Sequence, residues 1–212
     1  MSNSAAVGFI TDDRRRCMVN YRGEYTPDVL GARIVQFLRD LRPEQIEACT
    51  VRVKDLTWVD GWDKPSVELQ AEYSAKGFAQ ERFRGYNPGL GRYQSYLGVW
   101  TVLLKYATGS KILEPILTGD LRHLIDKTGD IEAGAPCQWA YFIDFENKVL
   151  ETWNGWSKWC EVNSEDSGIW FHFPSRDQPV TIRMKRVDVT PFHLLTVEHM
   201  KALNSRYGPP TF

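Results

Sequence analysis

The alternation of hydrophobic and polar positions is clearest between residues 138 and 156. Trp139, Tyr141 and Ile143 fall on one side of an extended chain. The polar link 146–148 then precedes a second extended run. Period-two alternation on both sides of a short polar link predicts a β-hairpin. Because both sides of its first strand are largely apolar, we expect this strand at the centre of a sheet that is covered on both faces.

The same reasoning predicts shorter elements in the rest of the chain. Strands are expected where apolar residues alternate, and helices where they recur every three or four positions. The predicted strands are 7–10, 15–21, 50–59, 169–173 and 180–189. The predicted helices are 29–41, 66–76, 93–106, 110–117 and 197–204, the last of them capped by Thr196, and a loop is expected at 85–91. Strands form hairpins near both ends and helices gather between them. This order predicts an α+β fold with a mainly antiparallel sheet and packed helices.

Length, charge and cysteine spacing narrow the class of protein. A chain of 212 residues without a linker is expected to form one domain over 1–212, with a lead-in at 1–6 and an extended tail at 206–212. The net charge of −1 disfavours nucleic acid as a partner, and no apolar run is long enough to cross a bilayer. The four cysteines are widely spaced and a signal-peptide pattern is missing, which favours reduced thiols in a cytoplasmic protein. The histidine and cysteine spacings predict neither a metal site nor a cofactor.

Three segments, taken together with an opening strand at 7–10, resemble one protein family. They contain Asn20, Tyr25, Pro27, Leu30 and Gly31, then VWTVLL at 99–104 with Thr108 and Gly109, then WAYFIDF at 139–145 with LETWNG at 150–155. In this order they are similar to a group of small uncharacterised proteins of actinobacterial viruses, which has relatives in bacteria and fungi. The signatures of that group are of the kind Y-N-H-x-D-S-Y-P-x-x-L-G and W-x-Y-V-I-D-L-D followed by F-E-V-Y-x-G.

The resemblance implies a viral origin and this order of elements, but no particular reaction. The histidine and the aspartate of the first signature have no counterparts here, because Tyr21, Arg22 and Glu24 occupy that region. If those two residues carry the chemistry of the group, that chemistry is lost or altered in this chain.

The first group of candidate functional residues is acidic. Asp144 and Glu146 lie two positions apart at the end of the first hairpin strand, and Glu151 lies on the partner strand. Paired carboxylates can divide the acid and base roles of a hydrolase when their surroundings separate their pKa values. The structural alternative is that Asp144 bonds to the backbone of the turn and that the glutamates are solvated.

The second group is a candidate site for a small anionic or nucleotide-like ligand. Arg22 could hold a phosphate, while Tyr21 and Tyr25 could stack on a base, at a loop that precedes a helix. The aromatic residues after the hairpin could add a stacking surface, for which core packing is the alternative. The predicted ligand-binding residues are Asn20, Tyr21, Arg22, Tyr25, Trp153 and Trp156.

Two further segments have ordinary explanations beside functional ones. The basic run 14–16 could contact nucleic acid, but Asp12 and Asp13 beside it favour a solvated hairpin tip. Ser2 would become an amino-terminal nucleophile if Met1 were removed, and the order of elements is loosely compatible with the layering of N-terminal-nucleophile hydrolases.

These observations lead to three hypotheses about function. The first is a viral accessory protein in the host cytoplasm that binds a small anionic ligand or a host protein. The second is a hydrolase that uses the hairpin carboxylates. The third is a structural module, such as a homo-oligomer, whose surplus aromatic residues form an interface.

Overall fold

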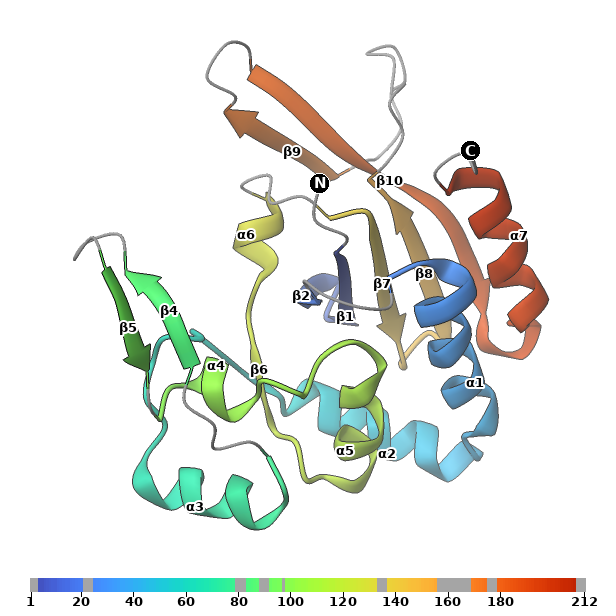
Figure 1. Ribbon diagram of the computed structural model, residues 1–212. Helices are drawn as coiled ribbons and strands as arrows, with labels where there is room; N and C mark the ends of the chain where they lie inside the picture. The colour runs from blue at the N-terminus through green and yellow to red at the C-terminus, as the bar shows by residue number, and fades with distance from the viewer. Residues whose placement is uncertain are drawn as a thin grey trace.

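A six-stranded sheet forms the centre of the protein. The structure is a computed structural model that describes residues 4–20, 25–78, 83–87, 92–96, 98–132, 137–155, 169–174 and 179–208. The strand order is β2-β1-β7-β8-β10-β9 (Figure 1). Its strands are β1 (Ala5–Thr11), β2 (Arg14–Asn20), β7 (Trp139–Asp144), β8 (Val149–Asn154), β9 (Ile169–Pro174) and β10 (Pro179–Pro191). Every pair of neighbours is antiparallel except β1 and β7, which confirms the predicted mainly antiparallel sheet.

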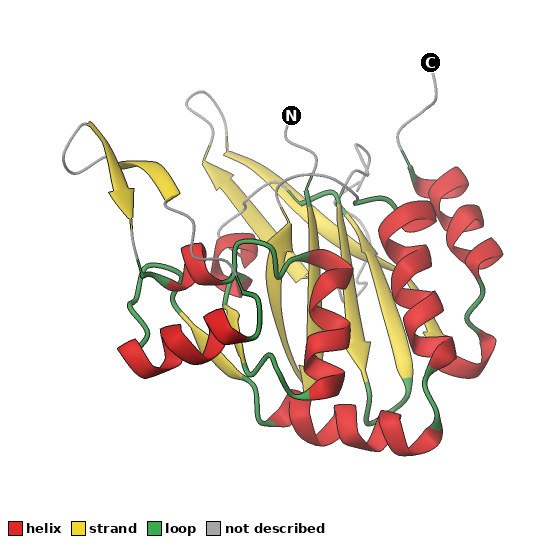
Figure 2. Ribbon diagram, turned by 60° about the horizontal axis from the view of Figure 1, so that its bottom comes forward, coloured by secondary structure: helices red, strands yellow, loops and turns green. Residues whose placement is uncertain are grey.

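Helices cover one face of this sheet, which completes the predicted α+β fold (Figure 2). The larger core lies between them and contains Val7, Tyr141 and Ile143 from the sheet. We call this side the helix face. The α-helices are α1 (Ala32–Asp40), α2 (Pro43–Lys54), α3 (Val67–Ala75), α4 (Trp100–Leu103), α5 (Leu113–Thr118), α6 (Thr128–Glu132) and α7 (Val197–Tyr207). Shorter helical segments are the π-helix η1 (Pro27–Gly31) and the 3₁₀ helices η2 (Gly109–Ile112) and η3 (Phe192–Leu194). Outside the large sheet, β3 (Thr57–Val59) pairs with β6 (His123–Ile125), and β4 (Phe83–Asn87) pairs with β5 (Arg92–Tyr96).

The opposite face of the sheet, called here the second face, has a smaller apolar core. Ala6, Cys17, Phe142 and Trp153 contribute to it, together with Ile131 from α6. The predicted hairpin is therefore confirmed as β7–β8, with β7 between β1 and β8 and apolar packing on both sides. The side chains of β7 point alternately into the two cores, so neighbouring residues on this strand have different surroundings.

Several sequence-based predictions of secondary structure were wrong. Residues 85–87 of the predicted loop 85–91 belong to β4, which pairs with β5. Most of the predicted strand 50–59 belongs to α2, and only 57–59 is extended. Pro43 is suited to the first turn of a helix, and Cys49 and Val53 are buried one turn apart, so the same apolar residues fit a helical stripe.

The predicted helix 93–106 is also wrong, since the chain forms β5 and then only the short helix α4. Gly98 lies between them at φ +67°, in the left-handed region, where a continuous helix cannot pass. The first strand starts at Ala5, inside the predicted lead-in, and α7 reaches Tyr207, inside the predicted tail. The structure confirms the cap of α7, because Thr196 Oγ1 accepts a hydrogen bond from the backbone N–H of His199 at 3.0 Å. Within the described ranges, the helices all fall short of the length and apolar character needed to span a membrane.

Candidate functional site

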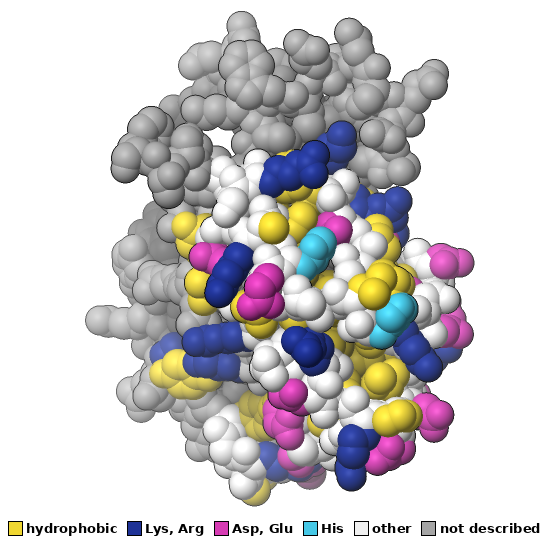
Figure 3. Space-filling view, turned by 90° about the vertical axis from the view of Figure 1, so that its right-hand side faces the viewer, with side chains coloured by type: hydrophobic (Ala, Val, Ile, Leu, Met, Phe, Trp, Pro, Cys, Tyr) yellow, Lys and Arg dark blue, Asp and Glu magenta, His cyan; other side chains and the backbone are white. Residues whose placement is uncertain are grey.

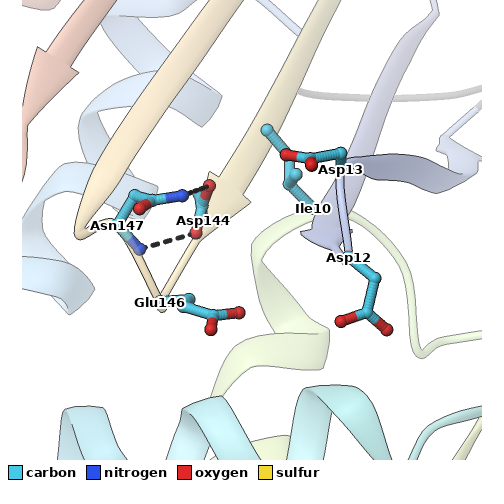
Figure 4. A pocket seen from close by; sticks show the side chains of 6 residues that line it. All are labelled: Ile10, Asp12, Asp13, Asp144, Glu146 and Asn147. Atoms are coloured by element: carbon cyan, nitrogen blue, oxygen red, sulfur yellow. Dashed lines mark hydrogen bonds between the residues drawn. The ribbon is translucent and has the colours of Figure 1, made fainter.

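Two hairpin turns meet at one end of the sheet and enclose an acidic cavity of about 310 Å³ (Figure 4). We call it the acidic pocket. The β1–β2 turn contributes two aspartates, and the β7–β8 turn contributes two more carboxylates. These carboxylates come together because β1 and β7 are parallel neighbours, so the turns that follow the two strands lie at the same end of the sheet. The residues lining the pocket are Ile10, Asp12, Asp13, Asp144, Glu146 and Asn147.

The two carboxylates of the β7–β8 turn already have partners. Asp144 is 5% exposed and accepts hydrogen bonds from the backbone N–H and the side-chain amide of Asn147, both at 2.8 Å. Glu146 extends from its turn toward the other turn and forms a 2.9 Å ion pair with Lys54 at the end of α2 (Figure 4). Asp144 therefore has the structural role that the sequence offered as an alternative, that of holding a turn.

The two aspartates of the β1–β2 turn differ from these, because both are exposed and the described residues offer them no hydrogen bond or ion pair. Asp12 and Asp13 adopt φ values of 48° and 60°. A two-residue hairpin turn with both residues in the left-handed region matches the twist of the strands, and aspartate is one of the few residues that tolerate it. The turn thus holds two exposed negative charges at the mouth of the pocket, which interact with Lys54 and Arg15 only through longer-range electrostatics.

The carboxylates of the two turns contribute to the raised pKa values of two nearby cations, Lys54 and Arg15. The pKa of Lys54 is raised by its hydrogen bond to Glu146, with further contributions from the charges of Glu146, Asp12 and Asp144. The pKa of Arg15 is also raised, chiefly by its hydrogen bond to Glu151, with smaller contributions from Asp13 and Asp144. Both cations therefore feel the negative potential of the two turns.

A metal ion does not suit this arrangement. Among the described residues, no group of three or more aspartate, glutamate, histidine or cysteine side chains is placed to hold one. The carboxylates surround a cavity instead of converging on a point. Ile10 adds an apolar wall, so the pocket suits a larger cation that has an aliphatic stem, such as a lysine or arginine side chain.

Glu151 lies on β8 of the β7–β8 hairpin, but its carboxylate is paired with two cations of the chain. It is 4% exposed, on the second face of the sheet. Arg15 donates from Nε and Nη2 to its two oxygens, both at 2.8 Å, and Arg186 donates from Nη1 at 3.0 Å. The indole N–H of Trp153 adds a fourth hydrogen bond at 3.0 Å. We call these four residues the Glu151 cluster.

The protonation of Glu151 follows from these contacts. Burial raises the pKa of this carboxyl, but the hydrogen bonds from Arg15, Trp153 and Arg186 and the charge of Arg15 outweigh it, so the net pKa is lowered. The guanidinium carbons of Arg15 and Arg186 lie 5.6 and 5.9 Å from the centroid of the Trp153 ring, within the range of cation–π attraction. Glu151 is therefore an ionised structural residue.

The residues predicted to bind an anionic ligand do not all come together. Tyr25 packs against the core of the helix face, and its backbone oxygen accepts a hydrogen bond from Tyr141 Oη at 3.0 Å. Trp153 belongs to the core of the second face and is 3% exposed. The sheet separates these two residues, so they do not form one stacking site, and the described surroundings of Trp153 match core packing. Asn20 ends β2 opposite Ala5.

Other predicted residues lie outside the described residues, so the hypotheses about them stay predictions. They are Tyr21, Arg22 and Trp156, together with Ser2.

Sequence reasoning missed the members of the pocket that lie far from the hairpin. Asp12 and Asp13 were assigned to a solvated tip, and Lys54 to a strand. A pair of acidic residues at a two-residue turn was the available signal, but only the parallel pairing of β1 with β7 places that turn beside Glu146. The face over α7 and β10 is different, because there acidic, basic and hydrophobic side chains are interspersed (Figure 3).

Comparison of this chain with protein-family models, with curated proteins and with solved structures gave no match.

Proposed function

We propose that this protein is a binding protein whose acidic pocket receives a lysine or arginine side chain of a partner protein. One observation carries the proposal: Asp12 and Asp13 are exposed at the mouth of the pocket and form no hydrogen bond or ion pair with a described residue, beside Lys54, whose pKa is raised chiefly by its hydrogen bond to Glu146. The Lys54–Glu146 ion pair illustrates, within the chain, the contact that a partner's cation would make. An exposed carboxylate pair can also steer a basic partner toward the site.

The negative charge of the pocket favours one of the sequence-based hypotheses over the others. A small anionic ligand would be repelled by the four carboxylates of the pocket. At the Glu151 cluster such a ligand would have to displace a carboxylate that is held by two guanidinium groups. We therefore carry forward the hypothesis of a protein partner. The resemblance to proteins of actinobacterial viruses favours a host protein with a basic surface segment.

The hydrolase alternative finds less support. A general base needs a carboxylate that can reach the substrate and accept its proton. Asp144 is held by Asn147, Glu146 by Lys54, and Glu151 by its two arginines. Asp12 and Asp13 lack such partners among the described residues, but both side chains are exposed to solvent.

The test is the binding of a fluorescein-labelled hexa-arginine peptide, measured by fluorescence anisotropy. In Asp12→Asn/Asp13→Asn, we expect Kd to rise about tenfold, because two exposed charge contacts contribute about 0.5–1 kcal/mol each. Asparagine tolerates the left-handed backbone at both positions, so the turn should persist.

The matched control is Glu47→Gln/Glu198→Gln, which removes the same charge from exposed positions on α2 and α7. Its Kd should stay within about twofold of that of the original protein. If both double variants bind the peptide equally weakly, the net charge alone explains binding and the pocket is not the binding site. A peptide that does not bind at low ionic strength would reject it as well.

A further inference from the structure

Away from the pocket, Tyr73 of α3 holds β6 through three hydrogen bonds. Its hydroxyl oxygen lies 3.0 Å from the backbone nitrogen of Arg122, 3.1 Å from that of His123 and 2.8 Å from His123 Nδ1. The Tyr73 side chain is fully buried. The three contacts join two segments that are far apart in the sequence.

Counting hydrogens fixes the state of the histidine. A tyrosine hydroxyl has one proton to donate and two lone pairs that can accept. The two backbone N–H groups can only donate, so they occupy both lone pairs. The hydroxyl proton must then point at His123 Nδ1, which has to be unprotonated. His123 is therefore neutral, with its single proton on Nε2.

Protonating His123 would disrupt this arrangement. Nδ1 would gain a hydrogen directed at an oxygen that has no lone pair left, and the Tyr73 proton would lose its acceptor. Unmet hydrogen bonds of buried groups are costly. The contact is thus compatible with only one protonation state of the imidazole.

The charged groups around His123 shift the pKa of its imidazole in opposite directions. Arg122, directly before β6, opposes a second positive charge, whereas Glu72 on α3 favours it. Glu72 is itself paired with Arg122 at 2.6 Å and with Lys76 at 3.0 Å, which weakens its effect. From α4, Trp100 contributes an uncharged ring stacked on the imidazole at 4.6 Å between centroids. Burial is the largest influence, and the net pKa of His123 is lowered.

The attachment of α3 depends strongly on this contact. Tyr73 is the only buried residue of α3, and its ring packs edge-on against Trp100 and Phe78. The other links from α3 to this region include the ion pairs of Glu72 and Lys76, which are partly exposed and so contribute little. Loss of the Tyr73–His123 contact would remove the polar anchor of α3 and leave the apolar packing of Tyr73 and of the partly buried Leu69.

We infer that Tyr73 and His123 form a pH-sensitive clasp, which holds α3 on β6 at neutral pH and releases it on acidification. This device is independent of the acidic pocket. The neutral histidine stabilises the closed form above the ordinary imidazole pKa, and that stabilisation is lost as the pH falls toward the lowered pKa of the folded protein. Release would free the helix that leads into the β4–β5 hairpin.

The test is hydrogen–deuterium exchange of α3, followed by mass spectrometry at about pH 7.5 and about pH 5 and corrected for intrinsic exchange rates. In the original protein, the protection of α3 should fall about tenfold at the lower pH, while that of β7 and β8 is maintained. In His123→Asn, the side-chain oxygen can replace Nδ1 as acceptor and does not titrate, so α3 should stay protected. His193→Asn, at an exposed position of η3, is the matched control and should behave like the original protein.

Unchanged protection of α3 in the original protein would overturn the clasp, as would an equal loss in His123→Asn. If His123→Asn does not fold, ring ¹⁵N NMR of the original protein decides. We expect the Nε2–H tautomer, whereas an Nδ1–H tautomer would contradict the inference.

Discussion

Glu151 on β8 and the aspartates that the β1–β2 turn contributes to the acidic pocket have opposite surroundings. Glu151 is buried, and two guanidinium groups and an indole N–H surround it. Asp12 and Asp13 are exposed and form no ion pair with a described residue, although Lys54 and Arg15 interact with them at longer range. A buried carboxylate that lacked partners would unfold the protein or become neutral, whereas an exposed one can remain uncompensated. An acidic residue whose charge is paired with neighbouring cations has a structural role, whereas one that forms no such ion pair is a candidate for binding a partner.

The largest expected effect comes from a carboxylate placed where the fold provides no partner. Ile143 is fully buried on the helix face, directly before Asp144, which has its partner in the turn. Ile143→Asp should prevent folding, because an unpaired buried charge costs several kcal/mol. Ile143→Val is the control and should cost only about 0.5–1.5 kcal/mol. Thermal unfolding followed by circular dichroism checks both, and cooperative unfolding of Ile143→Asp would contradict the central position of β7.

Removal of Glu151 should have the next largest effect. Glu151→Ala leaves two guanidinium groups and the buried Trp153 N–H without their acceptor. Because both arginines are partly exposed and can be solvated, we expect a loss of about 2–3 kcal/mol, below the usual range for a fully buried pair. Glu151→Gln keeps an acceptor and should lose less. Urea unfolding measures the difference, and a change within about 0.5 kcal/mol for Glu151→Ala would remove the structural role.

Acidification gives a second view of the same cluster. The pKa of Glu151 is lower in the folded protein than its ordinary value of 4.5, so its contribution is present above that value and is lost as the pH falls through the folded pKa. The difference in stability between the original protein and Glu151→Gln should therefore shrink below about pH 4.5. A difference that grows on acidification would mean that the carboxyl is destabilised by folding.

Asp144 provides the smallest effect of this series. Asp144→Asn keeps one acceptor for the Asn147 backbone N–H, but it places two amide groups against each other. A loss of about 1–2 kcal/mol is expected, the size of one charge-assisted hydrogen bond. Unchanged melting together with the loss of a measurable activity would reverse the assignment in favour of the hydrolase hypothesis.

The parts of this picture that follow local rules could be predicted from the sequence. The β7–β8 hairpin, the burial of Ile143 and the cap at Thr196 follow from periodicity and turn chemistry, which act over a few residues. Residues 50–59 could not be assigned from periodicity, because Val51 and Val53 fit a strand whereas Cys49 and Val53 fit a helix. The proximity of Cys49 and Val53 to the rest of the core decided between them.

The site was less accessible to such reasoning, since it depends on which strands pair. Asp12 and Glu146 are neighbours only because β1 lies parallel to β7, and Arg15 reaches Glu151 from a strand three places away in the sheet. The converse error concerned Tyr25 and Trp153, whose chemistry suggested one site. Tyr25, in the loop before η1, packs on the helix face, whereas Trp153 on β8 points to the second face, and the sequence held no long-range information with which to separate them.

The most direct test of the central claim is an NMR titration of the ¹⁵N-labelled protein with unlabelled hexa-arginine peptide. If Asp12 and Asp13 bind a partner's cation and Glu151 does not, the amide shifts should change at residues 10–13 and 144–147. The amides of Glu151 and Trp153 should keep their positions. Shifts centred on the Glu151 cluster, or spread evenly over the acidic surface, would contradict the claim that the pocket between the two turns is the binding site.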